Sequence, residues 1–504
     1  MEIPVESKVR ILIHCPQCRG DIEFLEEAQV IHCRFCGSSL LVAGREGVLR
    51  YVISPQVLDP RMARSLAEEH LRASRKGNPR VLEAFLFYAP FWRMQGMVYR
   101  WVFGQKVMKG GTLFQVPDPQ LEIKLPPPME REKVLLTRVM DHTIPGYAGL
   151  EMGLPTLGVR GQALRLQVFD REHLEERHSF LPLQVPLDRV QAEAERLGDL
   201  FFHTEEMAPE FILHRMVGRI FSLIYFPVWL VECRHAEGRE TLLIDGVGKK
   251  VLVTLAEKSS LLEKLQGEET RKPFKFSEIR FLPFRCPNCG WEFPFRPLSL
   301  LHFCPTCRHL WRERQGEWVE VKYQTIRLPL DPIPDGLLWV PFFRFRAVME
   351  SGGERLETMA DLYRMAPPPR ALNEERESSR PIYFYIAAVK FRNPQTFHTL
   401  ASRLSFLQPQ IELDSFPDGS HPFTAGGSLS EDDAMELGPV VLGSLIPPKN
   451  RKARAWFKNC RVDLQGPQVL YFPFTRADLF WKEMTTGISF QHNSLSEDLP
   501  EPPR

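Results

Sequence analysis

Alternating apolar and polar residues flank the dipeptide Asp245-Gly246. Residues 240–244 and 249–254 both alternate, and an Asp-Gly pair between two such segments is a strong signal for a tight β-hairpin. We therefore expect two antiparallel strands here. The preceding segment 225–229 is aromatic and apolar, so it is predicted to form another strand of the same sheet.

Apolar residues at helical spacing occur in both halves of the chain. Asp59-Pro60 opens an Ala-rich segment, and residues 190–197 place three apolar side chains on one helical face. In the second half, Asn393-Pro394 begins a similar run, and residues 430–433 have the spacing of a capping box. Strands and helices in this order predict an α+β fold, with a mainly antiparallel sheet and flanking helices.

A short aromatic-proline motif occurs four times. Each copy has an aromatic residue, one intervening residue, proline, and then one or two large apolar residues. The copies are Tyr88-Ala-Pro-Phe-Trp92, Tyr225-Phe-Pro-Val-Trp229, Trp339-Val-Pro-Phe-Phe343 and Tyr471-Phe-Pro-Phe474. We interpret each copy as an edge strand that packs its rings into the core, because proline is tolerated at strand edges.

Eight of the ten cysteines form two quartets with the same internal spacing. The quartets are Cys15, Cys18, Cys33 and Cys36, and Cys286, Cys289, Cys304 and Cys307. A Cys-x₂-Cys pair places two thiolates on one tight turn, and two such turns close a tetrahedral metal site. We expect two structural zinc ions, one in each quartet. Iron in a rubredoxin-like site is the main alternative, and disulfides are disfavoured because the sequence shows no signal peptide.

Both quartets resemble the zinc ribbons of the rubredoxin-like group. Together with the aromatic-proline strands, they are similar to a poorly characterised family of bacterial double-zinc-ribbon proteins. The resemblance rests on residues 15–36, 286–307, 225–248 and 471–487. It implies metal-binding modules and assigns no activity. Some members of that family accompany membrane-stress proteins, which implies at most a peripheral membrane association through partners.

Two features of the quartets depart from the simplest ribbon pattern. Arg19 and Arg308 stand where glycine is usual, which leaves the geometry of these two turns open. Four histidines lie beside the quartets and are alternative ligands: His14, His32, His302 and His309. We interpret them as outer-shell or surface residues, because each set of four cysteines is already complete.

A cysteine quartet followed by two aromatic-proline motifs occurs twice along the chain, which predicts two divergent copies of one unit. We expect zinc ribbons at residues 8–50 and 280–328, each followed by an α+β domain. The domains are predicted at residues 51–270 and 329–492, and a disordered tail at 493–504. Proline-rich segments such as residues 117–128 and 367–380 are interpreted as exposed loops or linkers.

Composition restricts the classes of function. The 64 basic and 63 acidic residues give a net charge of +1, so no global field attracts nucleic acid or anionic membrane. The longest apolar stretch, residues 220–231, is shorter than the roughly 18 residues of a spanning helix. We therefore expect a soluble, cytoplasmic protein.

Enzyme signatures are missing from the sequence. Four thiolates saturate a tetrahedral metal and leave no position for a reactive water, so both sites are predicted to be structural. The glycine-rich segment 246–250 lacks the frame of a phosphate-binding loop, and the sequence contains neither G-x-S-x-G nor H-E-x-x-H. Cys233 and Cys460 are interpreted as buried apolar residues. An enzyme site assembled across distant segments is the least favoured alternative.

Two kinds of partner remain. Basic and aromatic residues alternate in the segment 449–458, and more surround the second ribbon, as expected for a nucleic-acid contact. The candidate contacts are Lys449, Arg451, Lys452, Arg454, Trp456, Lys458, Arg308, Trp311 and Arg312. The alternative for 449–458 is a solvated loop that enters a strand. We favour a non-enzymatic scaffold whose ribbons present aromatic and basic residues to another protein, with nucleic-acid binding as the alternative.

Overall fold

The computed structural model describes residues 9–107, 129–158, 165–170, 174, 179–200, 202, 207–255, 265, 275–328, 336–367, 379–416 and 422–496. Contacts divide the chain into two compact units. Unit 1 comprises Met1–Gly96, Val139–Leu197 and Gly218–Pro283, and unit 2 comprises Met97–Arg138, Gly198–Val217 and Phe284–Arg504. Both units are assembled from separated stretches, whereas the sequence suggested contiguous domains.

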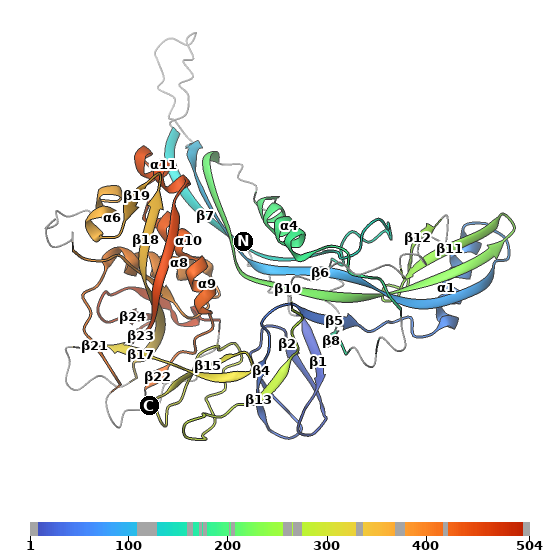
Figure 1. Ribbon diagram of the computed structural model, residues 1–504, viewed down its shortest axis with the longest axis horizontal. Helices are drawn as coiled ribbons and strands as arrows, with labels where there is room; N and C mark the ends of the chain where they lie inside the picture. The colour runs from blue at the N-terminus through green and yellow to red at the C-terminus, as the bar shows by residue number, and fades with distance from the viewer. Residues whose placement is uncertain are drawn as a thin grey trace, which may run out of the picture. The chain divides into compact units, whose positions relative to one another are not determined.

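The described residues form a mixed α+β structure that contains more strand than helix, as the sequence predicts (Figure 1). The proline-rich segment 117–128, residues 368–378 and the tail beyond residue 496 lie outside the described residues. Of the predicted tail, residues 493–496 are described, and Leu495 is buried with a relative exposure of 4%. No helix in the described part of the chain is long and apolar enough to cross a membrane.

Unit 1 contains a large sheet, a smaller sheet and helices. Its elements are β1 (Arg10–His14), β2 (Asp21–Leu25), β3 (Val30–His32), β4 (Ser39–Ala43), β5 (Leu49–Ile53), α1 (Pro60–Ala73), β6 (Arg80–Val107), β7 (Met129–Pro145), β8 (Arg165–Val168), β9 (Ser179–Phe180), α4 (Leu187–Leu200), β10 (Met207–His235), β11 (Gly238–Asp245), β12 (Val251–Leu255) and β13 (Arg280–Pro283). The strand order is β12-β11-β10-β5-β8-β1-β2, and β6 pairs with β10, β7 and β9. A separate sheet has the order β13-β4-β3. By the division above, β6, β7 and β10 contribute residues to both units, and α4 ends in unit 2.

Helix α1 packs against β11 and β12 in unit 1. It begins after Asp59, whose side chain accepts a hydrogen bond from Met62 N at 2.9 Å and so satisfies one free donor of the first turn. Its buried face includes Ala63, Ala67 and Leu71. The helix predicted after Asp59 is therefore confirmed, and so is the hairpin around Asp245-Gly246, which the structure forms from β11 and β12.

Unit 2 is built around two long paired strands. Its elements are β14 (His302–Phe303), β15 (Leu310–Arg314), β16 (Glu317–Val321), β17 (Tyr323–Ile326), β18 (Leu338–Ser351), β19 (Glu354–Leu356), α6 (Met359–Met365), β20 (Tyr383–Ala387), α8 (Pro394–Leu407), β21 (Leu413–Asp414), β22 (Phe423–Thr424), α9 (Glu431–Glu436), α10 (Gly438–Leu445), α11 (Arg451–Lys458), β23 (Arg461–Ala477), β24 (Phe480–Glu483), β25 (Ser489–Gln491) and the 3₁₀ helix His492–Ser494. The main path of the larger sheet is β19-β18-β23-β17-β21, and β14-β15-β16 form a smaller sheet.

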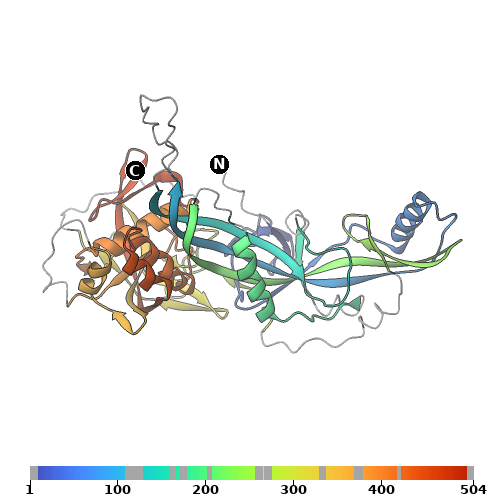
Figure 2. The same cartoon turned by 90° about the horizontal axis from the view of Figure 1, so that it is seen from above.

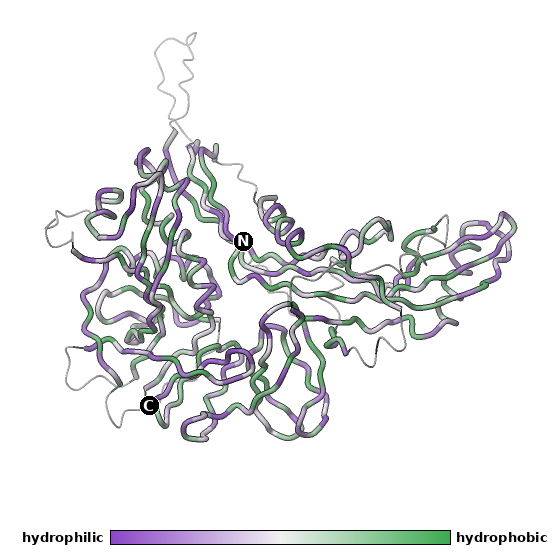
Figure 3. The backbone as a smooth tube through the Cα atoms, in the orientation of Figure 1, coloured by the Kyte–Doolittle hydropathy of each residue, from purple (hydrophilic) through white to green (hydrophobic). Residues whose placement is uncertain are grey.

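Helices pack on this sheet of unit 2 (Figure 2). Helix α8 contacts β20, and α10 contacts both β23 and α8. Apolar stretches run along the long strands (Figure 3). The helix start predicted at Asn393 is confirmed, since its side chain accepts from Gln395 N at 2.9 Å. Of the capping box predicted at residues 430–433, the structure shows the Ser430 half, in which the hydroxyl accepts from Asp433 N at 3.1 Å.

The C-terminus of α10 is capped by a half-buried lysine. Lys133 Nζ donates to Ile446 O at 2.7 Å, to Gly443 O at 3.2 Å and to the Ser444 carbonyl. A cation at this end of a helix satisfies carbonyls that have no partner within the helix. Burial lowers the pKa of Lys133 to about 8. Trp101, whose ring lies 5.5 Å from the ammonium, donates its Nε1 to the carbonyl of Val440 at 2.9 Å.

The four motif prolines lie inside the sheets, which corrects the interpretation of edge strands. They belong to β6, β10, β18 and β23, and each has neighbours on both sides. Each proline carbonyl accepts from the residue that directly follows the end of a neighbouring strand. The donors are Gly146 N to Pro90 O at 2.8 Å, Gly246 N to Pro227 O at 3.0 Å, Ala388 N to Pro341 O at 2.8 Å and Met484 N to Pro473 O at 3.1 Å. Proline has no N–H to donate, and each of these prolines lies where the hydrogen-bonded pairing with that neighbouring strand ends.

Candidate metal centres

Four tight turns of the same geometry carry the eight cysteines of the two quartets. In each turn, the residue after the second cysteine donates its N–H to the carbonyl of the first cysteine at 2.8 Å. The pairs are Arg19 to Cys15, Gly37 to Cys33, Gly290 to Cys286 and Arg308 to Cys304. A further bond returns from each first cysteine, for example from Cys15 N to Gly20 O at 2.9 Å. Both thiols of a turn are thereby fixed on one side of the backbone.

Arg19 and Arg308 adopt the backbone conformation that a glycine would adopt. Their φ angles are 59° and 60°, whereas Gly37 and Gly290 have 74° and 78°. All four residues lie in the left-handed region, which costs an L-residue roughly 1–2 kcal/mol. The two arginines therefore leave the turn geometry unchanged and bear a local strain.

Sulfur atoms from both turns converge in each ribbon. Across the first group, Cys15 Sγ lies 3.8 Å from Cys36 Sγ, and Cys18 Sγ lies 3.6 Å from Cys33 Sγ. The corresponding distances in the second group are both 3.5 Å, between Cys286 and Cys307 and between Cys289 and Cys304. Four sulfurs about 2.3 Å from a tetrahedral metal are separated by about 3.8 Å, whereas a disulfide bond is about 2.05 Å long. All ten cysteines are free, so the spacing fits metal coordination.

Each Cys₄ group can hold one metal ion. All four thiol sulfurs of a group lie within 4.8 Å of one another, and no histidine or carboxylate of the described residues belongs to either group. Near the first group, Ser38 Oγ lies 3.1 Å from Cys36 Sγ, and this hydrogen bond lowers the pKa of the Cys36 thiol to about 6, whereas desolvation and the neighbouring thiols raise the pKa of Cys18 to about 12. A low pKa favours the thiolate, which is the form that binds metal.

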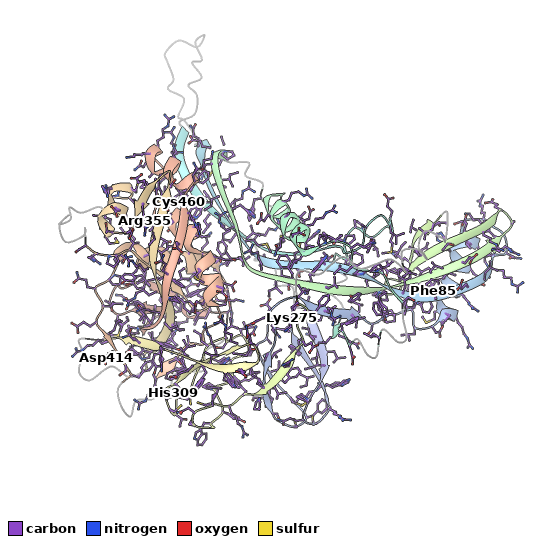
Figure 4. The ribbon with its side chains drawn as sticks, viewed as in Figure 1. Phe85, Lys275, His309, Arg355, Asp414 and Cys460 are labelled. Atoms are coloured by element: carbon purple, nitrogen blue, oxygen red, sulfur yellow. The ribbon has the colours of Figure 1, made fainter. Side chains whose placement is uncertain are left out.

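The four neighbouring histidines have other contacts. His14 Nδ1 lies 2.8 Å from Asp21, and His32 Nδ1 lies 3.4 Å from the Ser39 hydroxyl. His309, labelled in Figure 4, stacks on Trp311 with ring centroids 6.2 Å apart.

His302 belongs to the aromatic core of the second ribbon. Its ring centroid lies 5.1 Å from that of Phe284 and 5.4 Å from that of Trp318. Complete burial lowers its pKa to about 3, so His302 is neutral. The ring acts as one more aromatic residue of the ribbon core.

The ribbons obtain their third strand in two different ways. In the second ribbon, β15 pairs with β16, which follows after a short turn, and Leu310 is opposite Val321. In the first ribbon, the corresponding strand β4 pairs instead with β13 from more than two hundred residues later, and Leu40 is opposite Pro283. Strand β13 thus completes the hairpin sheet of the first ribbon within unit 1.

The predicted contact segment 449–458 is mainly a helix, α11, and not a loop that enters a strand. Arg451, Lys452 and Lys458 are exposed on it. Trp456 and Phe457 are buried, and Arg454 is 8% exposed and forms an ion pair with Glu210. An Asn450 cap and apolar residues at helical spacing are the sequence signals for this helix that we missed.

The candidate contacts on the second ribbon engage the rest of unit 2. Arg312 Nη1 lies 3.0 Å from Glu431 Oε2, and Arg308 Nη1 donates to Phe416 O at 3.4 Å. Trp311 is half-buried. The most exposed aromatic residues of the ribbons are others: Trp291 is 65% exposed, Phe295 is 49% exposed and Phe35 is 59% exposed.

Cys233 and Cys460 lie outside the metal groups. Cys233 is fully buried on β10, and burial raises its pKa to about 11. Cys460 is half-buried at the start of β23, and burial raises its pKa to about 12 (Figure 4). Both thiols are therefore protonated at neutral pH.

Comparisons with known proteins found no match. No protein-family model, no curated protein and no solved structure matches the chain. The function is therefore inferred from the geometry of the Cys₄ groups and from the two units.

Proposed function

We propose that the protein is a non-enzymatic, cytoplasmic zinc protein that acts as a scaffold for protein partners. The observation that carries this proposal is the convergence of four thiols at each of two ribbon sites, with no histidine or carboxylate from the described residues in either group. Four thiolates complete a tetrahedral Zn²⁺ and leave no position for a substrate or a reactive water. Residues Cys15, Cys18, Cys33 and Cys36 would hold one ion, and Cys286, Cys289, Cys304 and Cys307 the other. Bound zinc would supply folding energy to both ribbons.

The chain is proposed to contain two divergent copies of one unit. In support, the strand after each ribbon runs parallel to the second motif strand of its unit: Val52 on β5 is opposite Tyr225, and Thr325 on β17 is opposite Tyr471. Both post-ribbon strands also pair antiparallel with a short strand, β8 in unit 1 and β21 in unit 2.

Further equivalences surround the first motif strand of each unit. Strand β9 runs parallel to β6 and places Phe180 opposite Tyr88, and β22 runs parallel to β18 and places Thr424 opposite Trp339. In each unit, an aromatic side chain that follows β8 or β21 packs on the tyrosine of the second motif. Phe169 and Tyr225 have ring centroids 4.8 Å apart, and Phe416 and Tyr471 have ring centroids 5.7 Å apart.

Exposed aromatic residues on the ribbons support a protein partner. Trp291 and Phe295 expose 65% and 49% of their surface on the second ribbon, and tryptophan and phenylalanine are enriched at protein interfaces. The nucleic-acid alternative has less support, because Trp456 is buried and cannot stack on a base. The cations Arg451, Lys452 and Lys458 of α11 are exposed, and they are the remaining support for nucleic-acid binding.

The experiment is co-purification of tagged full-length protein from native extract, with metal content and absorbance at 260 nm recorded on the same sample. We expect two zinc ions per chain and a co-purifying partner protein. This partner should no longer co-purify with a Trp291→Ser/Phe295→Ser variant. Leu407→Ser, at an exposed position 52% accessible on α8, is the matched control. Enrichment of nucleic acid that is lost on charge reversal of Arg451, Lys452 and Lys458 would support the alternative instead. Catalytic turnover dependent on either Cys₄ site would contradict the proposal.

A further inference from the structure

Unit 2 contains an open cavity of about 470 Å³ beside β18, β20 and the C-terminus of α8. Its lining includes two arginines, two tyrosines, an isoleucine and one glutamate. These residues are Arg344, Arg380, Tyr383, Tyr385, Ile411 and Glu412. Cavities of this size commonly hold small molecules.

Arg344 contributes a positive charge to the cavity, and its contacts in the described part of the chain are with uncharged groups. Its Nε donates to Gln468 Oε1 at 2.8 Å, Nη2 donates to the same oxygen, and its guanidinium lies 4.9 Å from the centroid of the Tyr383 ring. Both partners are uncharged, and Arg344 forms no ion pair among the residues that the structure describes. A guanidinium with spare N–H donors at a cavity is suited to bind an oxyanion.

Arg93 occupies the equivalent position in unit 1, where two carboxylates pair with it. Arg93 follows Pro90 by three residues, as Arg344 follows Pro341. Arg93 donates to both oxygens of Asp141 at 2.7 Å and pairs with Glu26 at 2.5 Å, and its side chain is 1% exposed. The structure therefore buries one of these arginines with two carboxylates.

In unit 2 the carboxylate of Asp141 is replaced by an uncharged side chain. Gly146 and Ala388 donate to the motif prolines in the same way, and Asp141 and Tyr383 each lie five residues before them. Tyr383 thus takes the position of Asp141 and contacts Arg344 through its ring. Among the described residues no acid takes the place of Asp141 beside Arg344, and Arg344 lines the cavity.

The wall of the cavity is held in place by a buried glutamine. Gln408, 3% exposed, accepts from Tyr383 N at 3.1 Å through Oε1 and donates Nε2 to Ser405 O at 2.6 Å. Its carbonyl accepts from Arg380 Nη2 at 2.7 Å, which positions the second arginine. Glu412, the one acidic residue of the lining, lies with its carboxylate 3.3 Å from Arg327, which is not a lining residue.

We propose that this cavity binds a small oxyanion with an apolar or aromatic body, and that Arg344 and Arg380 hold its phosphate or carboxylate group. Tyr385 and Ile411 would contact the body of the ligand. Desolvated oxyanions are bound best by preformed guanidinium donors, and both arginines are positioned here without a ligand. This site lies outside the Cys₄ groups and is independent of the scaffold role.

Isothermal titration of the full-length, zinc-loaded protein tests the site with three probes at constant ionic strength: phenyl phosphate, benzoate and inorganic phosphate. We expect phenyl phosphate or benzoate to bind with Kd below about 1 mM, which corresponds to about −4 kcal/mol. The preference between these two distinguishes a phosphate from a carboxylate ligand. Inorganic phosphate should bind more weakly because it lacks the apolar body.

Arg344→Gln and Arg380→Gln should each weaken binding at least tenfold. Arg346→Gln is the matched control, since Arg346 lies on the same strand, is exposed and pairs with Glu357 at 3.5 Å away from the lining. Thermal melting of each variant checks folding, and Arg380→Gln alone suffices if Arg344→Gln does not fold. Absence of binding by all three probes, or an equal loss in Arg346→Gln, would overturn the proposal.

Discussion

Arg93 and Arg344 follow their motif prolines at the same distance, but Arg93 is buried between Glu26 and Asp141 whereas Arg344 is half-exposed and paired with an uncharged glutamine. The two environments have different energetic consequences. Removing one partner of a buried ion pair leaves uncompensated charge, and removing an exposed arginine leaves only lost packing.

Arg93→Met should destabilise unit 1 by about 3–5 kcal/mol, because two carboxylates would remain buried without a counter-ion. Arg344→Met, the matched control, should cost less than about 1 kcal/mol. Urea unfolding followed by tryptophan fluorescence measures both. Adding Glu26→Gln and Asp141→Asn to Arg93→Met should recover part of the loss. Equal costs for the two arginine variants would show that the cluster around Arg93 is not electrostatically significant.

Lys133 predicts a pH dependence of stability. Burial lowers its pKa in the folded protein from 10.5 to about 8, so the unfolded chain binds more protons between pH 8 and 10.5. In this range the contribution of Lys133 to the free energy of unfolding should rise with pH, by up to about 3 kcal/mol. The measurement is the difference between wild type and Lys133→Met in urea unfolding at pH 7.5, 9 and 10. A difference that stays constant over this range would contradict the assignment.

The left-handed arginines predict a stabilising substitution. Arg19 is exposed and has φ of 59°, so Arg19→Gly removes the backbone strain and should stabilise ribbon 1 by roughly 0.5–1 kcal/mol, after the entropy of the added glycine is subtracted. Since metal binding and ribbon folding are coupled, zinc affinity should rise several-fold in competition with a chromophoric chelator.

Gly37→Ala is the matched control for Arg19→Gly, because it places a side chain at φ of 74° on the other turn of the same ribbon. Its zinc affinity should fall by a similar factor. If both substitutions changed affinity in the same direction, backbone strain would not be the determining property of these turns.

Local signals in the sequence were sufficient where one short segment determines the structure. Cysteine spacing predicted both metal groups, Asp59 and Asn393 predicted helix starts, and Asp245-Gly246 predicted a hairpin, because each depends on backbone geometry within a few residues. The motif prolines were placed on strands, but the edge position was wrong. Whether a neighbouring strand continues or ends beside a proline depends on residues far away in the chain.

The cavity in unit 2 illustrates what a linear pattern cannot reveal. Arg344 and Arg380 lie far apart in the sequence, and the packing of β18, β20 and the end of α8 brings them to one cavity. One signal was present: both first motifs continue to an arginine three residues after proline, at Arg93 and Arg344. Which arginine would be neutralised depended on Glu26 and Asp141, and their proximity is a property of the fold.

Metal content per chain, measured by elemental analysis of the purified protein, tests the central claim most directly. We predict two zinc ions in the wild type and in Cys233→Ser, one in Cys33→Ser, one in Cys304→Ser, and none in the double variant of the last two. Loss of both ions after a single substitution, or fewer than one metal ion per wild-type chain, would contradict two independent Cys₄ zinc sites.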